Sequence, residues 1–207
     1  MQENTAGIRQ GAPKGMDRET LEFAQQVFDL VRSGYADRLK PLLEHGLPAN
    51  LRNQRGDSLL MLASYHGHHD VAEALLRHGG DAELRNDMGQ TPIAGAAYKG
   101  DLAMVRLLLE HGANVEGAAP DGKTALMMAA MFNRTEVARL LLAHGADPKA
   151  RDDKGMSPLA AARAMGAPDT AALLENLDRN FDALPVPATD EPDQPSSAGA
   201  GGNRTIS

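Results

Sequence analysis

Residues 89–122 read GQTPIAGAAYKGDLAMVRLLLEHGANVEGAAPDG, and the pattern of this stretch returns along the chain. One series of glycines stands at positions 46, 79, 112 and 145, so that each step is 33 residues. A second glycine series at 56, 89, 122 and 155 and a leucine series at 42, 75, 108, 141 and 174 keep the same step. A fixed period of this length is typical of a stacked repeat protein, in which each unit leaves an apolar face that only its neighbours can cover.

The residues within one period predict two helices and a finger. Ser58, Thr91, Thr124 and Ser157 follow the second glycine series and are placed to cap a first helix, whose first position tolerates proline. This helix is predicted to end at Gly34, Gly67, Gly100, Asn133 and Gly166, because glycine and asparagine readily adopt the left-handed conformation past a helix end. A second helix with a buried Leu-Leu pair, such as Leu108-Leu109, then ends at the first glycine series. Residues such as 113–122 are predicted to form a turn-rich, extended finger.

Two segments of the chain resemble the ankyrin repeat: Gly-x-Thr-Pro-Ile-x-x-Ala-Ala at 89–97 and Leu-Leu-Leu-Glu-His-Gly-Ala at 107–113. The resemblance covers residues of about 20 to 177 and is closest to the small stand-alone ankyrin proteins of bacteria. It implies an all-α solenoid of about five helix-turn-helix repeats with β-turn fingers. The chain departs from the family pattern where a histidine is usual, since it has Met61, Ala94, Met127 and Ala160 there, so we expect cohesion to rely more on packing.

Three segments are expected on this basis. The repeat domain spans 17–177, with repeats at about 20–52, 53–85, 86–118, 119–151 and 152–177. A longer helix, roughly Asp17 to Ser33, resembles an N-terminal cap, and Glu175 replaces a leucine where no further repeat follows. Residues 1–16 and the Pro/Gly/Ser-rich tail 178–207 are expected to be disordered. Within the tail, Phe181 with Leu184 is expected to cap the last repeat, or else to serve as a docking motif.

Composition excludes several classes of function. The 207 residues include no cysteine, which rules out disulfides and Cys-ligated zinc and fits a reducing compartment. A net charge of -7 argues against nucleic-acid binding, which needs a basic face. The polar start of the chain lacks the apolar stretch of a signal peptide, and no apolar run has the length of a membrane span. We therefore expect a cytoplasmic protein that binds neither nucleic acid nor membrane.

The histidines are the only plausible centre for chemistry. His45, His78, His111 and His144 share one position, where we expect them to interact with the free carbonyls of a helix end. Stacked helices lie about 8–10 Å apart, whereas a shared zinc needs each nitrogen about 2 Å from one ion, so this row cannot form one site. The turn His66–His69 remains an alternative metal site, although its three histidines lack the spacing of a known closed site.

No catalytic residue, cofactor or metal is predicted. Every glycine is accounted for by turns and caps, which leaves no phosphate loop. The finger-tip aspartates are expected to bond their own backbone and to stay solvated; they are Asp57, Asp87, Asp121, Asp152 and Asp153. The sequence therefore predicts a protein that is not an enzyme.

The resemblance implies that a partner meets the finger tips and the exposed end of the first helix, which together line a concave groove. Three of the seven aromatic residues fall at these helix ends, where the chain has Tyr65, His66, Tyr98, Lys99, Met131, Phe132, Ala164 and Met165. Large aromatics with a polar end are typical anchors of binding. We expect the two tyrosines to be exposed, whereas Phe132 and the methionines have the alternative of folding inward. The finger tips add Gln54, Arg55, Asp57, Asp87, Met88, Gln90, Asp121, Lys123, Asp153, Lys154 and Met156, whose mixed charges suggest a rim that sets orientation.

The predicted function is binding of another protein through the concave face by a chain that is monomeric when free. It acts as an inhibitor, immunity protein or enzyme regulator in one hypothesis, and as a passive assembly adaptor in another. A metal-binding protein that uses the His66–His69 turn is the competing class. Metal analysis of the purified protein separates this class from the other two.

Overall fold

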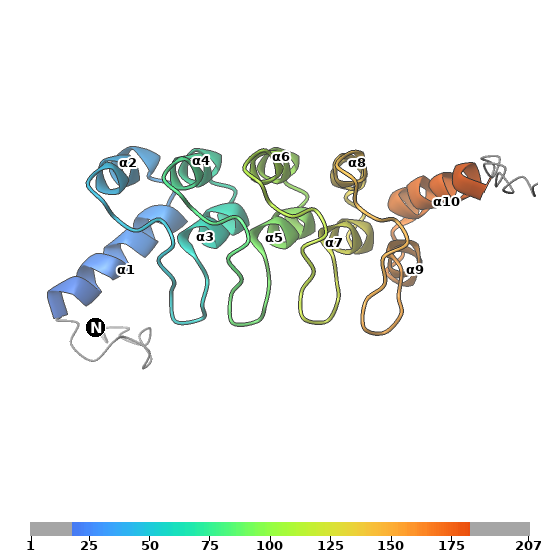
Figure 1. The fold of residues 1–207 in the computed structure, drawn as a ribbon, viewed down its shortest axis with the longest axis horizontal. Coiled ribbons are helices and arrows are strands. Elements are labelled where there is room, and N and C mark those ends of the chain that lie inside the picture. Colours follow the sequence, from blue (N-terminus) through green and yellow to red (C-terminus); the bar gives the residue numbers. More distant parts are fainter. Residues whose placement is uncertain (1–17, 183–207) are drawn as a thin grey trace, which may run out of the picture.

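The computed structural model of the protein describes residues 18–182, which form five consecutive pairs of helices (Figure 1). The first helices of the pairs are α1 (Arg18–Arg32), α3 (Leu59–His66), α5 (Pro92–Lys99), α7 (Ala125–Met131) and α9 (Pro158–Ala164). The second helices are α2 (Ala36–Glu44), α4 (His69–Arg77), α6 (Leu102–Glu110), α8 (Thr135–Ala143) and α10 (Pro168–Asp182). First helices pack on neighbouring first helices and second helices on neighbouring second helices, which confirms the predicted solenoid of about five repeats.

Four fingers connect the pairs and project from the same edge of the first-helix row (Figure 1). A hydroxyl residue ends each finger and starts the next helix. Ser58, Thr91, Thr124 and Ser157 each accept a hydrogen bond from the backbone N–H three residues later, at 3.1, 3.4, 3.3 and 3.2 Å. These bonds satisfy N–H groups that have no partner within the helix. The predicted starts of the first helices are therefore confirmed.

The first helices end in left-handed residues, as predicted. Gly34, Gly67, Gly100 and Gly166 have φ angles of 75°, 74°, 79° and 66°. Asn133 takes the same place after α7 with φ 54° and is the one non-glycine residue with positive φ between residues 18 and 182. Asparagine is tolerated there because it adopts this conformation more readily than other residues with a Cβ.

The core runs through the repeats as one long cluster and one small one. Leu75, Leu108 and Leu141 are fully buried in the long cluster, between second helices and the first-helix row. Met61 and Met127 are also buried, which agrees with packing in place of the family's usual histidine. The small cluster, under α10, is built from Ala130, Ala162, Ala167, Ala171 and Leu174. Four of its five buried residues are alanines, and the partly buried Leu142, Leu159 and Leu177 pack against them, so it buries less apolar surface than the long cluster.

The C-terminal boundary differs from the sequence-based prediction. The tail was predicted to start at residue 178, but α10 continues to Asp182 and has 15 residues, against 9 in α8. The stretch from 169 to 182 contains neither proline nor glycine, which explains why the helix continues. Glu175 pairs with Arg163 at 2.8 Å and with Arg179 at 3.7 Å, so its face is polar, as predicted for the last repeat. The cap predicted for Phe181 and Leu184 lies outside the described side chains, as do residues 1–17 and 183–207.

Candidate partner-binding surface

The helix-end stripe consists of the side chains at the ends of successive first helices: Tyr65, His66, Tyr98, Lys99, Met131, Phe132, Ala164 and Met165. The two tyrosines are exposed, with 50% of Tyr65 and 37% of Tyr98 accessible to solvent. Met165, His66 and Lys99 are exposed as well, whereas Met131 and Phe132 are half-buried. The expected exposure of the tyrosines is therefore observed. Phe132 and Met131 are partly turned inward, so the alternative expected for them holds in part.

Contacts along the stripe join one repeat to the next. The Nζ atom of Lys99 lies 4.1 Å from the centre of the Tyr65 ring, in a cation-π contact. The rings of Tyr98 and Phe132 meet edge to face, with 4.5 Å between their centres. Both contacts restrict the rotamers of exposed side chains before any partner arrives. A surface that is already ordered loses less conformational entropy on binding.

The surroundings of His66 favour its neutral form. Its ring stacks on the ring of His68, with 6.0 Å between the centres, and meets Tyr65 edge to face at 5.5 Å. Burial lowers the pKa of His66 below its ordinary value, and the neighbouring charges of His68, Arg32 and Lys99 lower it further. Lys99 therefore supplies the charge of this part of the stripe at neutral pH.

The other two histidines of the His66–His69 turn join neighbouring repeats. The Nε2 atom of His68 donates a hydrogen bond to the carbonyl of Arg32 at 2.8 Å. The Nε2 atom of His69 lies 2.9 Å from both carboxylate oxygens of Asp101. In the part of the chain that the structure describes, no group of three or more His, Cys, Asp or Glu residues is arranged to hold a metal ion.

The repeated histidines close the second helices. The Nδ1 atoms of His45, His78, His111 and His144 donate to the carbonyl four residues earlier, at 2.7, 2.8, 3.0 and 2.9 Å. These carbonyls lie in the last turn of each helix, and those of Pro41, Leu107 and Leu140 also accept from the backbone N–H of the same histidine. The predicted role at the helix end is confirmed.

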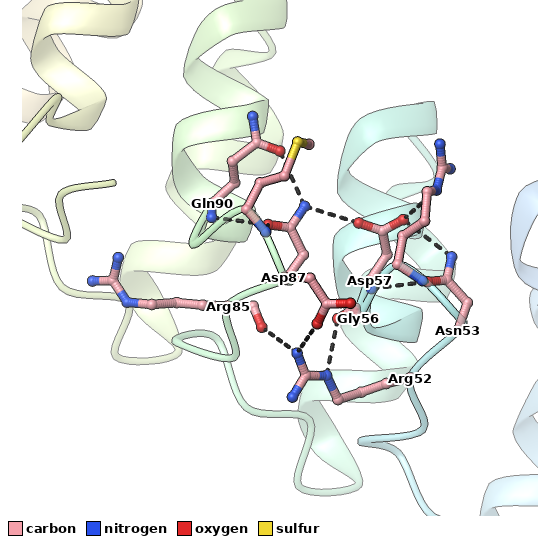
Figure 2. Close-up of polar contacts among 10 residues, drawn as sticks. Arg52, Asn53, Gly56, Asp57, Arg85, Asp87 and Gln90 are labelled. Atoms are coloured by element: carbon pink, nitrogen blue, oxygen red, sulfur yellow. Dashed lines mark hydrogen bonds and ion pairs between the residues drawn. The ribbon is translucent and has the colours of Figure 1, made fainter. Parts of the chain in front are cut away.

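Arginine side chains fasten the fingers to one another (Figure 2). Arg52 donates from Nε to the carbonyl of Gly56 at 3.0 Å, within its own finger. Its Nη2 atom donates to the carbonyl of Arg85 in the next finger at 2.8 Å and lies 3.4 Å from the carboxylate of Asp87. Arg85 repeats the pattern with the carbonyls of Gly89 and Ala118. These contacts hold neighbouring fingers to one another.

A buried amide network stabilises the finger turns and corrects one prediction. The Oδ1 atom of Asn86 accepts from the N–H groups of Met88 and Gln90 at 3.1 and 2.9 Å. Its Nδ2 atom donates to Asp57 of the preceding finger at 2.9 Å (Figure 2). Asp57 is only 8% exposed, and Asp152 only 7%, so these two aspartates do not stay solvated as expected. Asp57 is covered because the next finger packs against it, and it holds two fingers together.

The remaining finger residues form the rim of the surface. Arg55, Asp87, Met88, Gln90, Asp121, Asp153 and Lys154 are exposed, whereas Lys123 and Met156 are half-buried. The ammonium of Lys123 donates to the carboxylate of Asp121. This hydrogen bond lowers the pKa of Asp121 and raises that of Lys123, so both remain charged at neutral pH. The two opposite charges of this finger tip therefore offset each other.

Sequence reasoning missed two features of this surface. Tyr35 is exposed and lies at the start of α2, with the guanidinium of Arg38 5.5 Å from its ring centre. Its place in the 33-residue period is the same as that of Arg134, whose Nε atom donates to the carbonyl of Tyr98 at 3.2 Å. Tracing the period through this position, one residue after the helix-ending glycines, would have identified both.

No helix between residues 18 and 182 is both long enough and apolar enough to span a membrane.

Comparison with known proteins gives two findings. Residues 27–118 and 116–183 match the sequence family described as "Ankyrin repeats (3 copies)". A stretch of 56 residues is 65% identical to part of a Pseudomonas aeruginosa protein that is itself named for its ankyrin repeats. The match spans 27% of this chain and 33% of that protein.

Proposed function

This chain belongs to the ankyrin-repeat family, whose repeats form protein-binding modules, and we propose that it binds one partner protein through the helix-end stripe and the exposed finger residues. Bound in this way, it acts as an inhibitor or regulator of that partner. Proteins of this family are generally non-catalytic, and we propose no reaction for this one. The observation that supports the proposal most directly is that Tyr65 and Tyr98, on two neighbouring repeats, are both exposed.

The stripe has the properties of an anchor for a partner. Tyrosine combines a large apolar ring with a hydroxyl that can still pair with a partner, and such residues account for much of the energy at interfaces. Tyr65 and Tyr98 are held by Lys99 and Phe132 while their outer faces remain exposed. The fixed fingers beside them supply polar and charged groups, which suits a rim around the anchors.

The proposal is tested by comparing the partner proteins that bind to the wild-type chain with those that bind to a variant of the helix-end stripe. The chain is immobilised and used to capture proteins from an extract of the cell that encodes it, beside the double variant Tyr65→Ala/Tyr98→Ala. Each tyrosine that is a true hot spot should contribute about 2 kcal/mol or more, or roughly 30-fold in affinity. The control is Glu73→Ala/Arg106→Ala on the second helices, which should bind like wild type. If the tyrosine variant still captures the partners and the control variant does not, the helix-end stripe is not the binding surface.

Stoichiometry separates regulator from adaptor. A regulator should form a one-to-one complex with the captured protein, measured by light scattering or calorimetry. An adaptor should hold two different proteins in one complex, and finding such a complex would replace the regulator proposal.

A further inference from the structure

Basic side chains bridge three successive gaps between repeats along the helix-end stripe. Between α1 and α3, the Nε2 atom of His68 donates to the carbonyl of Arg32 at 2.8 Å. Between α3 and α5, the ammonium of Lys99 lies over the ring of Tyr65 at 4.1 Å. Between α5 and α7, the guanidinium of Arg134 donates from Nε to the carbonyl of Tyr98 at 3.2 Å. Each basic side chain therefore reaches back across the gap onto the preceding repeat.

The fourth gap, between α7 and α9, is bridged by Asn133 and Thr170 together with an acidic group, since the Nδ2 atom of Asn133 donates to the Asp169 carboxylate at 2.8 Å. The Oδ1 atom of Asn133 accepts from the N–H groups of Asp169 and Thr170. The Thr170 hydroxyl donates to the carbonyl of Ala130 at 2.9 Å. Among residues 18–182, the row of basic side chains therefore ends before the last repeat.

Two cations of this row have no carboxylate partner among residues 18–182. Lys99 and Arg134 are exposed, and neither forms an ion pair within the described part of the chain. The carboxylates closest in the repeat pattern are already engaged: Asp101 with His69 and with the N–H of Met104, and Asp29 with Arg32 at 2.9 Å. On the fingers, Asp87 and Asp121 face Arg52 and Lys123. The exposed carboxylates of Asp70 and Asp153 lie outside the stripe.

The stripe is thus locally positive on a chain whose net charge is -7. A long-range attraction for anions is not expected from such a chain, because its overall field repels them. Positive side chains that stay unpaired beside exposed aromatic rings instead favour a short-range contact. A carboxylate placed beside each cation gains a charge-assisted contact, while apolar groups between the carboxylates cover the rings.

We propose, on the basis of the function proposed above, that the part of the partner that lies on the stripe is an extended, acidic peptide segment with aromatic or aliphatic residues between its carboxylates. Stacked helices are about 8–10 Å apart and an extended chain advances about 3.3 Å per residue. One repeat therefore corresponds to about three residues of the bound segment. Because Lys99 and Arg134 lie one repeat apart in the stacking, the acidic side chains that pair with them stand at positions i and i+3 of the segment.

Selection from a random peptide library tests the proposal with a defined probe. The full chain is used to enrich peptides displayed on phage, and the enriched sequences are compared with those that the Tyr65→Ala/Tyr98→Ala variant retains. Asp and Glu should be enriched, with a spacing of three residues, and Lys and Arg should be depleted. Enriched peptides that depend on the tyrosines but are neutral or basic overturn the acidic segment and leave the proposed function standing. Peptides that both proteins retain equally overturn the proposed function, and the absence of any enriched peptide overturns the extended segment.

Matched charge changes identify the residues that bind the selected peptide. Lys99→Gln and Arg134→Gln should each weaken its affinity about two- to fivefold at physiological salt, with a larger effect at low salt. Arg106→Gln removes the same charge from exposed α6 and should leave affinity unchanged. Circular dichroism shows whether each variant is folded. If Arg134→Gln does not fold, Lys99→Gln alone tests the site. Equal effects of the Arg106 and Lys99 changes would show general charge attraction and overturn the site.

His66 provides a second readout that is independent of affinity. Burial is the main cause that lowers its pKa, and the neighbouring charges of His68, Arg32 and Lys99 lower it further. A carboxylate bound beside Lys99 offsets these charges and raises the pKa of His66. An NMR titration with and without the selected peptide should show this rise at His66 and no change at His78, whose ring bonds the end of α4. A His66 pKa that stays constant or falls on binding overturns the placement of the acidic segment.

Discussion

Asn133 has two roles at the end of α7. Its backbone takes the left-handed conformation that glycine takes in the other repeats. Its Oδ1 atom also accepts from the N–H groups of Asp169 and Thr170 at 3.0 and 3.1 Å, and its Nδ2 atom donates to the Asp169 carboxylate at 2.8 Å. The side chain thereby caps the start of α10 from the preceding repeat. If only the backbone conformation mattered, replacing Asn133 by glycine would not change stability. Because the replacement also removes the cap, it should lower stability.

Substitutions at Asn133 should separate these two roles. Asn133→Gly keeps the backbone conformation but removes the cap, so it should reduce the free energy of unfolding by about 1 kcal/mol. Asn133→Val loses the cap and adds a branched Cβ in the left-handed region, so the reduction should be about 2 kcal/mol or more. Urea denaturation measures both. Equal stability of the two variants would contradict the left-handed assignment.

Ser64 has a buried hydroxyl for which the structure shows no hydrogen-bond partner. The equivalent positions in the next two repeats hold Ala97 and Ala130, both fully buried. An unpaired buried hydroxyl costs about 1–3 kcal/mol. Ser64→Ala should therefore stabilise the protein by about 1 kcal/mol, seen as a higher urea midpoint with an unchanged slope. A lower midpoint would mean that the hydroxyl has a partner, such as a bound water.

His66 should make stability depend on pH. Its pKa in the folded protein is lower than the ordinary value of 6.5, so the unfolded chain binds more protons as the pH falls through this value. The stabilising contribution is complete above pH 6.5 and is lost as the pH falls from there towards the folded pKa. Wild type should thus lose stability relative to His66→Gln between neutral and mildly acidic pH, in thermal melts followed by circular dichroism. A gap between the two proteins that is independent of pH would contradict the lowered pKa.

At the scale of elements, the fingers differ in how strongly they are joined. The N–H of Asp87 donates to the carbonyl of Arg55 at 3.1 Å, and the N–H of Asp153 donates to that of Asp121 at 3.1 Å. Pro120 occupies the equivalent position in the third finger and has no N–H to donate. Its ring lies instead against Gly89, where an added Cβ would come within 2.2 Å of it. The second and third fingers are therefore joined by packing and by Arg85, without this backbone bond.

Asn86 should contribute more to stability than any exposed finger residue. Asn86→Ala removes two hydrogen bonds within the turn and the bond to buried Asp57, so it should cost about 2–3 kcal/mol. Gln54→Ala, at an exposed finger tip, is the control and should change stability by less than about 0.5 kcal/mol. Thermal melts compare the two, and hydrogen exchange of Met88 and Gln90 shows whether the turn opens. Similar stabilities would indicate that water replaces the amide network.

Local chemistry in the sequence was sufficient to predict the helices of the repeats. Capping hydroxyls, left-handed glycines and the leucine period each depend on residues close in the chain, so they could be recognised without coordinates. The burial of Asp57 could not be predicted in this way, because it depends on Asn86 in the following finger, 29 positions away. The cap that Asn133 provides to α10 was missed for the same reason. The exposure of Tyr65 and Tyr98 could be predicted from their place at the helix ends, while the pairing of Lys99 with Tyr65 depends on how neighbouring repeats stack.

At the scale of the whole molecule, the solenoid is stabilised unevenly. Each internal repeat buries its leucines against neighbours on both sides within the long cluster. The last repeat contributes Leu174 to a small cluster in which the other buried residues are alanines. In a linear array, stability is approximately the sum of the units and their interfaces, so a weak interface at one end allows that end to open first. The C-terminal pair α9 and α10 should therefore exchange amide hydrogens faster than α5 and α6.

Two leucine changes test this gradient. Leu108→Ala leaves a cavity between two neighbouring repeats and should cost about 2–5 kcal/mol in global unfolding. Leu174→Ala removes an equally buried side chain but has a neighbour on one side only, so its cost should be smaller and should appear mainly as faster exchange in α9 and α10. Urea denaturation gives the global values and hydrogen exchange gives the local ones. Leu174 lies in α10, whereas Lys99 lies at the end of α5. Local opening of α9 and α10 should therefore leave peptide binding at Lys99 intact. A larger global loss for Leu174→Ala would show that the C-terminal pair supports the whole array, contrary to the gradient inferred from its alanine-rich core.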